Sequence, residues 1–290
     1  MKGKTVVLTG ASRGIGEFIA AAFAKEQVTV IGVSRSKDKL DEVCNQINVL
    51  GGKGIGIPFD ISKVEELPIL VKKINNLTDS VDILINNAGI EIYHKFTDYS
   101  LTDIQSLLST NLISAIELSR LLLPNMLERQ EGHIVNIASL AAKKGHPFDS
   151  IYSASKAGLL MWSDALRQEL IDTGVGISVI CPGYVSQQGV FANTGIPAPT
   201  FSGTSKPEDV ANAVIKAIKK NKAEIVVNQD PITEILTKLL LALWQLYPRL
   251  GDAFYNSIGV TKLNQMRIKK ISFEETIGIK NQSKKIKTTI

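Results

Sequence analysis

Tyr152 and Lys156 are the residues of this chain whose types and spacing best suit catalysis. They stand four positions apart in the segment Tyr-Ser-Ala-Ser-Lys, and residues at that spacing share one face of a helix. A free phenol has a pKa of about 10, and a neighbouring ammonium favours its ionised form. The pair therefore predicts a tyrosine of lowered pKa that acts as a general acid/base. The alternative is a helical pair that arises by chance.

Two other segments place polar groups where α/β proteins bind ligands. Ser139 follows the apolar run of residues 133–138, which is typical of a buried strand, and open α/β sheets bind ligands at the carboxyl ends of their strands. Residues 9–16, Thr-Gly-Ala-Ser-Arg-Gly-Ile-Gly, follow the apolar strand of residues 5–8 and open a helix. Glycines there allow a tight turn and a close approach of the backbone to phosphate.

With these segments the chain resembles the short-chain dehydrogenase/reductase family from residue 4 to about residue 228. The resemblance implies hydride transfer between a nicotinamide cofactor and a carbonyl or secondary alcohol. It also implies a Rossmann-type fold. The motifs that carry it, besides the glycine-rich turn, are Asn86-Asn87-Ala88-Gly89, Asn111, Ser139, Tyr152, Lys156 and Pro182-Gly183.

The resemblance implies a role for each of four catalytic residues. Tyr152 exchanges the proton, while Ser139 hydrogen-bonds the substrate oxygen. Lys156 holds the nicotinamide ribose and lowers the pKa of Tyr152. Asn111, inside the helical pattern of residues 101–127, helps to hold a water that links Lys156 to solvent.

The end of the second strand indicates which nicotinamide cofactor is bound. An NAD site usually presents a carboxylate to the ribose 2′-hydroxyl there, but this chain has Ser34 followed by Arg35. Arg35 and Arg13 can bind a 2′-phosphate bidentately, so we expect NADP(H). The alternative is that Arg35 is a solvated loop charge. The remaining expected cofactor contacts are Gly10, Ser12, Gly14, Ile15, Gly16, Ser34, Ser36, Asp60, Ile61, Asn87, Ala88, Gly89, Tyr152, Lys156, Pro182, Gly183, Val185 and Ser186.

An apolar or acyl substrate is expected from the loop between Tyr184 and Ser205. This segment has neither helical nor strand periodicity, and the family carries its substrate-covering loop here. Ser139, Tyr184 and Phe191 are the predicted substrate contacts, and the loop also contains Val190, Ile196 and Phe201. These apolar residues could instead cap the core. His146 and Phe148 could line the mouth of the site, although a lone histidine is more often exposed.

Seven apolar runs must position these residues, and they alternate with helical patterns. Such alternation predicts parallel strands with crossover helices on both faces. We therefore expect an α/β fold with a doubly wound, seven-stranded parallel sheet. The expected strands are residues 4–8, 28–33, 53–58, 81–85, 132–138, 175–181 and 223–228.

The 290 residues divide into one catalytic domain of residues 1–230, a helical extension of residues 231–261 and a basic tail of residues 262–290. The two cysteines form no cluster with metal-ligand spacing, so no metal site is expected and the compartment should be reducing. The amino terminus lacks a signal-peptide pattern, which favours a cytoplasmic protein.

The net charge of +5 comes from the tail, where residues 262–290 carry eight Lys/Arg against two Glu. The body is almost neutral, so we expect no nucleic-acid partner. Residues 231–247 predict an amphipathic helix too short to span a bilayer. This helix could cover the substrate cleft, pair with a second subunit in a dimer, or lie on a membrane. Trp244, Tyr247 and the basic tail favour peripheral membrane contact through residues 231–290.

Within the family, the chain resembles reductases of β-ketoacyl groups, with two departures. Gln130 and Thr173 stand where those enzymes place arginines for an acidic carrier protein, and Asn228-Gln229-Asp230-Pro231 replaces their Gly-Gly ending. The extended ketoacyl-reductase-like proteins of cyanobacteria are the more similar group. The alternative function is a regulatory protein that senses NADP without relevant turnover, but a sensor does not need the proton relay.

Overall fold

The computed structural model describes residues 1–186, 194–199 and 202–270, which contain one sheet of seven parallel strands. The strand order is β3-β2-β1-β4-β5-β6-β7. The predicted fold class is confirmed, and every strand lies within two residues of its expected bounds. The strands are β1 (Thr5–Thr9), β2 (Thr29–Ser34), β3 (Lys53–Pro58), β4 (Ile83–Asn86), β5 (Gly132–Ile137), β6 (Val175–Pro182) and β7 (Glu224–Val227).

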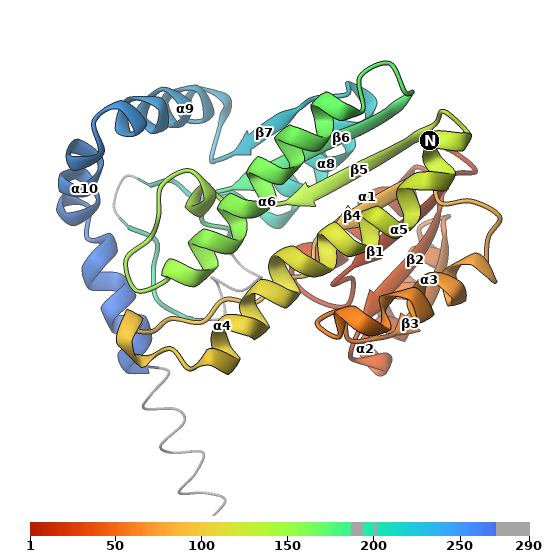
Figure 1. Ribbon diagram of the computed structural model, residues 1–290, viewed down its shortest axis with the longest axis horizontal. Helices are drawn as coiled ribbons and strands as arrows, with labels where there is room; N and C mark the ends of the chain where they lie inside the picture. The colour runs from red at the N-terminus through yellow and green to blue at the C-terminus, as the bar shows by residue number, and fades with distance from the viewer. Residues whose placement is uncertain (187–193, 200–201, 271–290) are drawn as a thin grey trace, which may run out of the picture.

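Helices cover both faces of the sheet (Figure 1). On one face lie α1 (Ile15–Lys25), α2 (Lys37–Val49) and α8 (Pro207–Lys219), whose apolar side chains pack in one core with β1. On the other face lie α3 (Leu67–Asn75), α5 (Ser114–Glu128) and α6 (Ser150–Glu169). Burial on both faces explains why the strands are continuous apolar runs rather than alternating patterns.

A long helix combines α4 (Leu101–Leu108), a π-helical turn (Ser109–Ile113) and α5. Ser100 and Asp103 cap its start reciprocally. Within the described part of the chain, it is the one helix long and apolar enough to cross a membrane. Its Leu118, Leu122 and Met126 side chains, however, are buried in the core against the sheet. Its apolar composition therefore reflects its place inside the fold.

Three helical segments follow the catalytic domain and cross the carboxyl end of the sheet (Figure 1). They are α9 (Pro231–Leu246), α10 (Pro248–Ser257) and residues 260–270. The Asp230 carboxylate caps α9 by accepting from the N–H groups of Ile232 and Thr233. The helix starts at Pro231 as expected, and helical structure continues past residue 262 into the segment expected to be tail.

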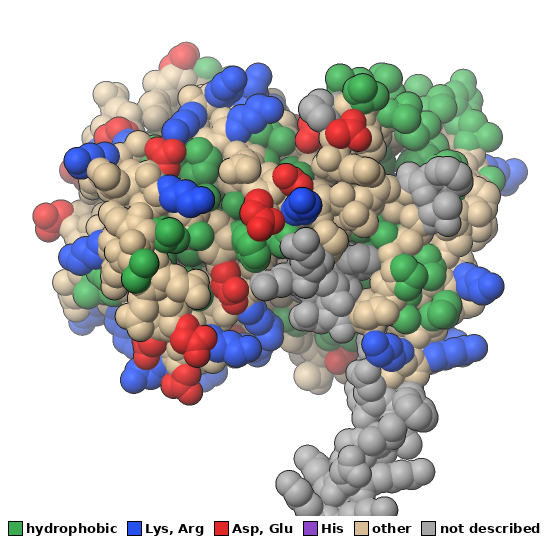
Figure 2. Space-filling view, turned by 180° about the vertical axis from the view of Figure 1, so that it is seen from behind, with side chains coloured by type: hydrophobic (Ala, Val, Ile, Leu, Met, Phe, Trp, Pro, Cys, Tyr) green, Lys and Arg blue, Asp and Glu red, His purple; other side chains and the backbone are tan. Residues whose placement is uncertain are grey.

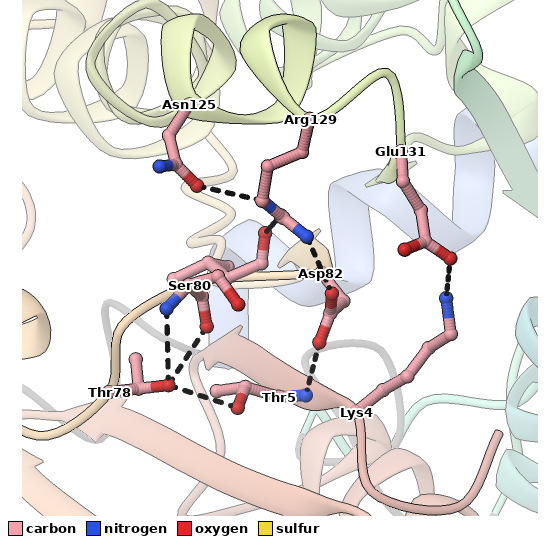
Figure 3. Close-up of polar contacts among 9 residues, drawn as sticks. Lys4, Thr5, Thr78, Ser80, Asp82, Asn125, Arg129 and Glu131 are labelled. Atoms are coloured by element: carbon pink, nitrogen blue, oxygen red, sulfur yellow. Dashed lines mark hydrogen bonds and ion pairs between the residues drawn. The ribbon is translucent and has the colours of Figure 1, made fainter.

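At the opposite end of the sheet, Arg129 joins the end of α5 to the start of β4 (Figure 3). Its guanidinium donates to Asp82 Oδ1 at 3.0 Å, to the Val81 carbonyl at 2.8 Å and to Asn125 Oδ1 at 3.0 Å. Asp82 Oδ2 in turn accepts from the Thr5 N–H at 2.7 Å, at the start of β1. One side chain thus fixes the register of two neighbouring strand starts.

Arg129→Met should lower the free energy of unfolding by about 1 to 2 kcal/mol, because Asp82 and the Val81 carbonyl lose a charged donor while partly buried. Urea unfolding of the pure protein measures this. The matched control is Arg120→Met, which removes an exposed ion pair with Glu117 and should leave the unfolding midpoint near that of the wild type. Equal effects of both changes would contradict this account of Arg129.

Candidate active site

A cavity of about 1130 Å³ opens along the carboxyl ends of the strands. Residues that directly follow β1 to β7 contribute to its wall, which is the edge where open α/β sheets bind ligands. The cavity wall contains every described cofactor, catalytic and substrate residue expected from the sequence except Gly16, Asn111 and Ser186. Phe191, Val190 and Phe201 lie outside the described residues.

The glycine-rich turn closes tightly between β1 and α1. Gly10 has φ +67°, and a Cβ atom there would lie 2.8 Å from the Ala88 Cα atom. Gly14 has φ +61° at the start of α1. The Asn87 side-chain amide donates to the carbonyls of Thr9 and Gly10 at 3.0 and 3.2 Å, which holds the turn against the end of β4. The turn therefore has no space for a side chain at Gly10. We call the backbone of Gly10 and Gly14 at the start of α1 the cradle, and it suits the binding of a phosphate.

Gly16 does not line the cavity, and a direct cofactor contact there stays a prediction. A Cβ atom on Gly16 would lie 2.1 Å from the Gly10 carbonyl oxygen. Gly16 is therefore required for the close packing of the helix start on its own turn.

The far end of the cavity carries a group of cations. Arg13 and Arg35 line it as expected, and Lys39 of α2 joins them; no motif in the sequence indicated Lys39. The Ser12 and Ser34 hydroxyls are hydrogen-bonded to each other across the turn. Three cations converging on one wall suit a phosphate group.

Two acidic residues also line the far end of the cavity. Neither lies at the end of β2, where an NAD site usually has a carboxylate and this chain has Ser34. Glu17 belongs to α1, and burial raises its pKa. Asp60 accepts from the N–H and the hydroxyl of Ser62 at 3.1 and 2.8 Å. Its carboxylate therefore stabilises the local turn in addition to lining the cavity.

Tyr152, Lys156 and Ser139 meet at the middle of the cavity. Tyr152 and Lys156 lie one turn apart on α6, with the Lys156 Nζ atom 5.7 Å from the centre of the Tyr152 ring. The ammonium donates to the Ile137 carbonyl at 2.8 Å, at the end of β5. The Ser139 hydroxyl is hydrogen-bonded to the Tyr152 phenol. The end of β5 and the α-helix that follows it, α6, thus bring the three side chains to one place.

The pKa of Tyr152 is raised, so the expected lowering of this pKa is wrong for the described structure. Burial is the main cause, and the nearby carboxyls of Glu91 and Asp149 add to it, whereas the Ser139 hydrogen bond acts in the opposite direction. Burial also lowers the pKa of Lys156, to about 8. The phenol is therefore held protonated and is suited to donate a proton.

Asn111 lies behind the cavity wall and not in it. Its Oδ1 atom accepts from the Ile90 N–H at 2.8 Å, and its Nδ2 atom donates to the Ile90 carbonyl at 2.9 Å and to Ser155 Oγ at 3.1 Å. The residue belongs to the π-helical turn, an irregularity that is frequent at functional sites. In this structure Asn111 fixes the backbone next to Lys156, and its role with a water stays a prediction.

Ser186 is also absent from the cavity wall, and its direct cofactor contact stays a prediction. Its hydroxyl donates to the Ser205 carbonyl at 3.1 Å, and its N–H donates to the same oxygen at 2.9 Å. The residue therefore joins the two ends of the loop that follows β6.

The extension builds the substrate end of the cavity. The wall here is apolar and aromatic, and the expected contact Tyr184 lies in it. His146 is stacked with the Tyr184 ring at 6.1 Å and packs edge-on to the Tyr255 ring at 5.6 Å. Burial lowers the pKa of His146 to about 4, so it is a neutral aromatic group near pH 7. The lining residues from the extension are Thr237, Leu240, Leu241, Trp244, Phe254, Tyr255, Ile258 and Val260.

Several of these wall residues were missed by the sequence prediction. Glu91 and Tyr93 follow the Asn-Asn-Ala-Gly motif, and no motif in the sequence indicated them. The apolar residues of α9 were recognised as one face of a helix, but sequence periodicity could not decide what that face covers.

Known proteins resemble this chain over most of its length. A family model described as short chain dehydrogenase matches residues 4–194. The ketoacyl reductase HetN of Nostoc sp. is 57% identical over 267 residues, which are 92% of this chain and 93% of that protein. This confirms the predicted similarity to the cyanobacterial type. An uncharacterized oxidoreductase of Staphylococcus aureus is 36% identical over 230 residues, which are 79% of this chain and 96% of that protein.

Solved structures show the same architecture. A metagenomic short-chain oxidoreductase in complex with NADP is 26% identical, with a TM-score of 0.69 over 79% of this chain and 99% of its own. A short-chain dehydrogenase of Sphingobium yanoikuyae in complex with NADPH is 25% identical, with a TM-score of 0.71 over 77% of this chain and 87% of its own.

Proposed function

The chain belongs to the short-chain dehydrogenase family, and we propose that it is an NADP(H)-dependent oxidoreductase that reduces the carbonyl group of an apolar or acyl-type substrate. The observation that carries the proposal is the meeting of Tyr152, Ser139 and Lys156 between a phosphate-binding turn and an apolar chamber. This arrangement places an acid beside the position of a bound carbonyl oxygen.

NADP(H) fits the residues present. The cradle of Gly10 and Gly14 suits the diphosphate at the start of α1, and Arg13, Arg35 and Lys39 suit the 2′-phosphate. Two of the similar solved structures contain NADP or NADPH. When bound, the reduced cofactor supplies hydride to the carbonyl carbon.

The protein's own residues supply the proton and the orientation. Ser139 hydrogen-bonds the carbonyl oxygen, and Tyr152 donates its phenolic proton to that oxygen as negative charge develops on it. The raised pKa of Tyr152 keeps this proton in place before the reaction. Lys156 binds the ribose and, with a pKa of about 8, can return a proton to the phenolate.

The substrate chamber favours an uncharged acyl or carbonyl compound. Its described lining beyond Lys156 is apolar or aromatic, apart from Glu91 and a few neutral polar groups such as Tyr93, Asn228 and Thr237. A ketoacyl group satisfies this description, and the relative HetN carries the name ketoacyl reductase. The second candidate, a protein that senses NADP without turnover, needs the glycine-rich turn but gives no reason for the Tyr152 site.

The extension gives the chain a second surface, and we propose that it binds the surface of a membrane. The outer face of α9 and the start of α10 expose a set of large apolar side chains (Figure 2, upper right). Exposed Lys238 and Arg249 lie on the same segment, and the seven Lys of residues 262–290 add positive charge, which suits anionic lipid. The members of this apolar face are Ile232, Ile235, Leu236, Leu239, Leu243, Leu246, Tyr247 and Leu250.

A protein of this composition would act at the border between the cytoplasm and a membrane, and we expect it to form a homo-oligomer, as a dimer. In this proposal residues 1–230 form the catalytic domain and residues 231–290 serve the substrate chamber and the membrane.

Tyr152→Phe should reduce turnover with NADPH at least about 100-fold, because it removes the transferable proton and keeps the ring. NADPH binding, measured by fluorescence titration, should be largely retained. Tyr99→Phe is the matched control, since it removes a phenolic hydroxyl that donates to the Ile92 carbonyl outside the cavity wall, and it should keep turnover within a few-fold of the wild type. Near-normal turnover in Tyr152→Phe would refute the assigned role.

Arg35→Asp should weaken NADPH binding roughly 10-fold to 100-fold, because one charge-assisted bond to the 2′-phosphate is lost. Binding of NADH should change little or improve, since a carboxylate can accept from a 2′-hydroxyl. Calorimetric titration with both nucleotides measures the ratio. An unchanged NADPH affinity would show that Arg35 is a solvated charge and that Arg13 and Lys39 carry the selectivity.

Flotation with liposomes tests the membrane surface. The wild type should float with anionic vesicles at low salt and separate from them at high salt. The double variant Ile235→Glu/Leu239→Glu should stay in the unbound fraction, whereas Val49→Glu/Ile69→Glu, which changes exposed apolar residues on α2 and α3, should float like the wild type. If the wild type stays unbound and sediments as a dimer that the first variant dissociates, the apolar face is a subunit interface instead.

A further inference from the structure

Two carboxyl groups face each other in the interior beside Tyr152. Glu91 follows β4, and its Oε1 atom accepts from the Tyr93 hydroxyl at 2.7 Å. Asp149 precedes α6 and is fully buried. Although Asp149 occupies the capping position of α6, its side chain does not cap the helix. Both Asp149 oxygens are buried without a hydrogen-bond partner among the described residues, and the Glu91 carboxyl is near enough to raise the pKa of Asp149.

The two neighbouring carboxyls influence each other's protonation. Two carboxylates close together in a desolvated site repel each other, and this repulsion favours protonation of one of them. Burial is the main cause of the raised pKa of both groups. The pair therefore keeps one proton and one negative charge, and that charge must be balanced inside the protein.

The balancing charge comes from the extension. Arg267 lies in the helical segment of residues 260–270 and is fully buried. Its guanidinium is near enough to lower the pKa of both carboxyls, and it lies 5.5 Å from the centre of the Tyr93 ring. It also donates to the side-chain oxygen of Asn264 and, at 3.1 Å, to the Pro197 carbonyl. These contacts fix the guanidinium beside the pair.

Lys156 is the other cation that acts on the pair, and it acts on Glu91. The neighbouring titratable groups from the packed elements are neutral near pH 7: burial raises the pKa of Tyr93, Tyr99 and Tyr184 and lowers that of His146. Tyr152 is affected by both carboxyls. The charge on the pair therefore reaches the proposed catalytic phenol directly.

We propose that Arg267 is a positioning residue that balances the buried Glu91–Asp149 pair and makes the C-terminal extension part of the active site. Without the guanidinium, the pair places an uncompensated negative charge beside Tyr152. The part of this inference that concerns catalysis rests on the proposed function. The part that concerns charge balance does not.

The first test needs no activity and follows the thermal midpoint of Arg267→Met between pH 5.5 and 9. A carboxyl whose folded pKa is raised binds protons more tightly in the folded state, so its contribution to stability is lost as pH rises. Removing Arg267 raises these pKa values further, and the midpoint of the variant should fall more steeply with pH than that of the wild type. Arg267→Lys keeps the positive charge, so the pH dependence of its thermal midpoint should be close to that of the wild type.

The second variant separates charge from packing. Arg267→Met/Glu91→Gln removes one of the two carboxyls and should recover much of the midpoint lost at pH 8. Lys270→Met is the matched control, because Lys270 lies on the same helix and donates to the Thr194 carbonyl at 2.8 Å away from the pair; its midpoint should follow the wild-type dependence on pH. A loss in Arg267→Met that is the same at every pH and is not relieved by Glu91→Gln would overturn the proposal.

The catalytic consequence is measured as the pH profile of NADPH-dependent reduction. Reduction needs protonated Tyr152 and protonated Lys156, whose pKa is about 8. An uncompensated negative charge raises both pKa values, so the alkaline fall in kcat/KM should move to higher pH, by about one pH unit. The double variant should return it toward the wild-type position. If the pH profile of Arg267→Met is not shifted, the negative charge of the pair does not act on Tyr152. Absence of reduction in the wild type would instead refute the proposed function, and the thermal series would still decide the charge balance.

Discussion

Removal of water from the centre of the cavity is the physical condition on which the site depends. Desolvation opposes charge, so it raises the pKa of the Tyr152 phenol and lowers that of the Lys156 ammonium toward 8. The same condition favours protonation of one of two neighbouring carboxyls and makes a fully buried arginine necessary. A partly hydrated cleft would weaken each of these effects, because water screens and solvates charge. The catalytic character of the site therefore depends on how completely the chain closes around it.

The sheet alone does not provide that closure. Its carboxyl edge offers backbone and short polar side chains, which suit the phosphates and ribose of a dinucleotide but leave the reactive end open. Trp244, Phe254 and Tyr255 close that end from a part of the chain that follows the last strand. The match to HetN covers 267 residues of this chain, so it must include part of the extension. The match to the Staphylococcus aureus protein covers 230 residues, which is the length of the catalytic domain.

The sequence was sufficient for the sheet and for most of the cofactor site. Strands buried on both faces are continuous apolar runs, and the glycine-rich turn and the Tyr152–Lys156 pair depend on local spacing. Local spacing could not distinguish Gly16, which packs on Gly10, from glycines that line the cavity. It could not show the pKa direction of Tyr152 either, because that direction depends on burial and on Glu91 and Asp149. The contribution of Arg267, more than one hundred residues distant in sequence, has no local signal at all.

The position of the closing helices at the end of the chain has a consequence for biosynthesis. Domains fold from the amino terminus while the ribosome still adds residues, so the glycine-rich turn and Tyr152 are available before Arg267 has been made. The nascent protein should therefore be able to hold its nucleotide early, while its reactive centre stays wet and its buried acids stay unbalanced. Only when the last segments fold down over the sheet does the apolar end of the cavity gain its wall from the extension. A chain that ends near residue 230 would therefore keep the nucleotide-binding domain and lack the closing helices.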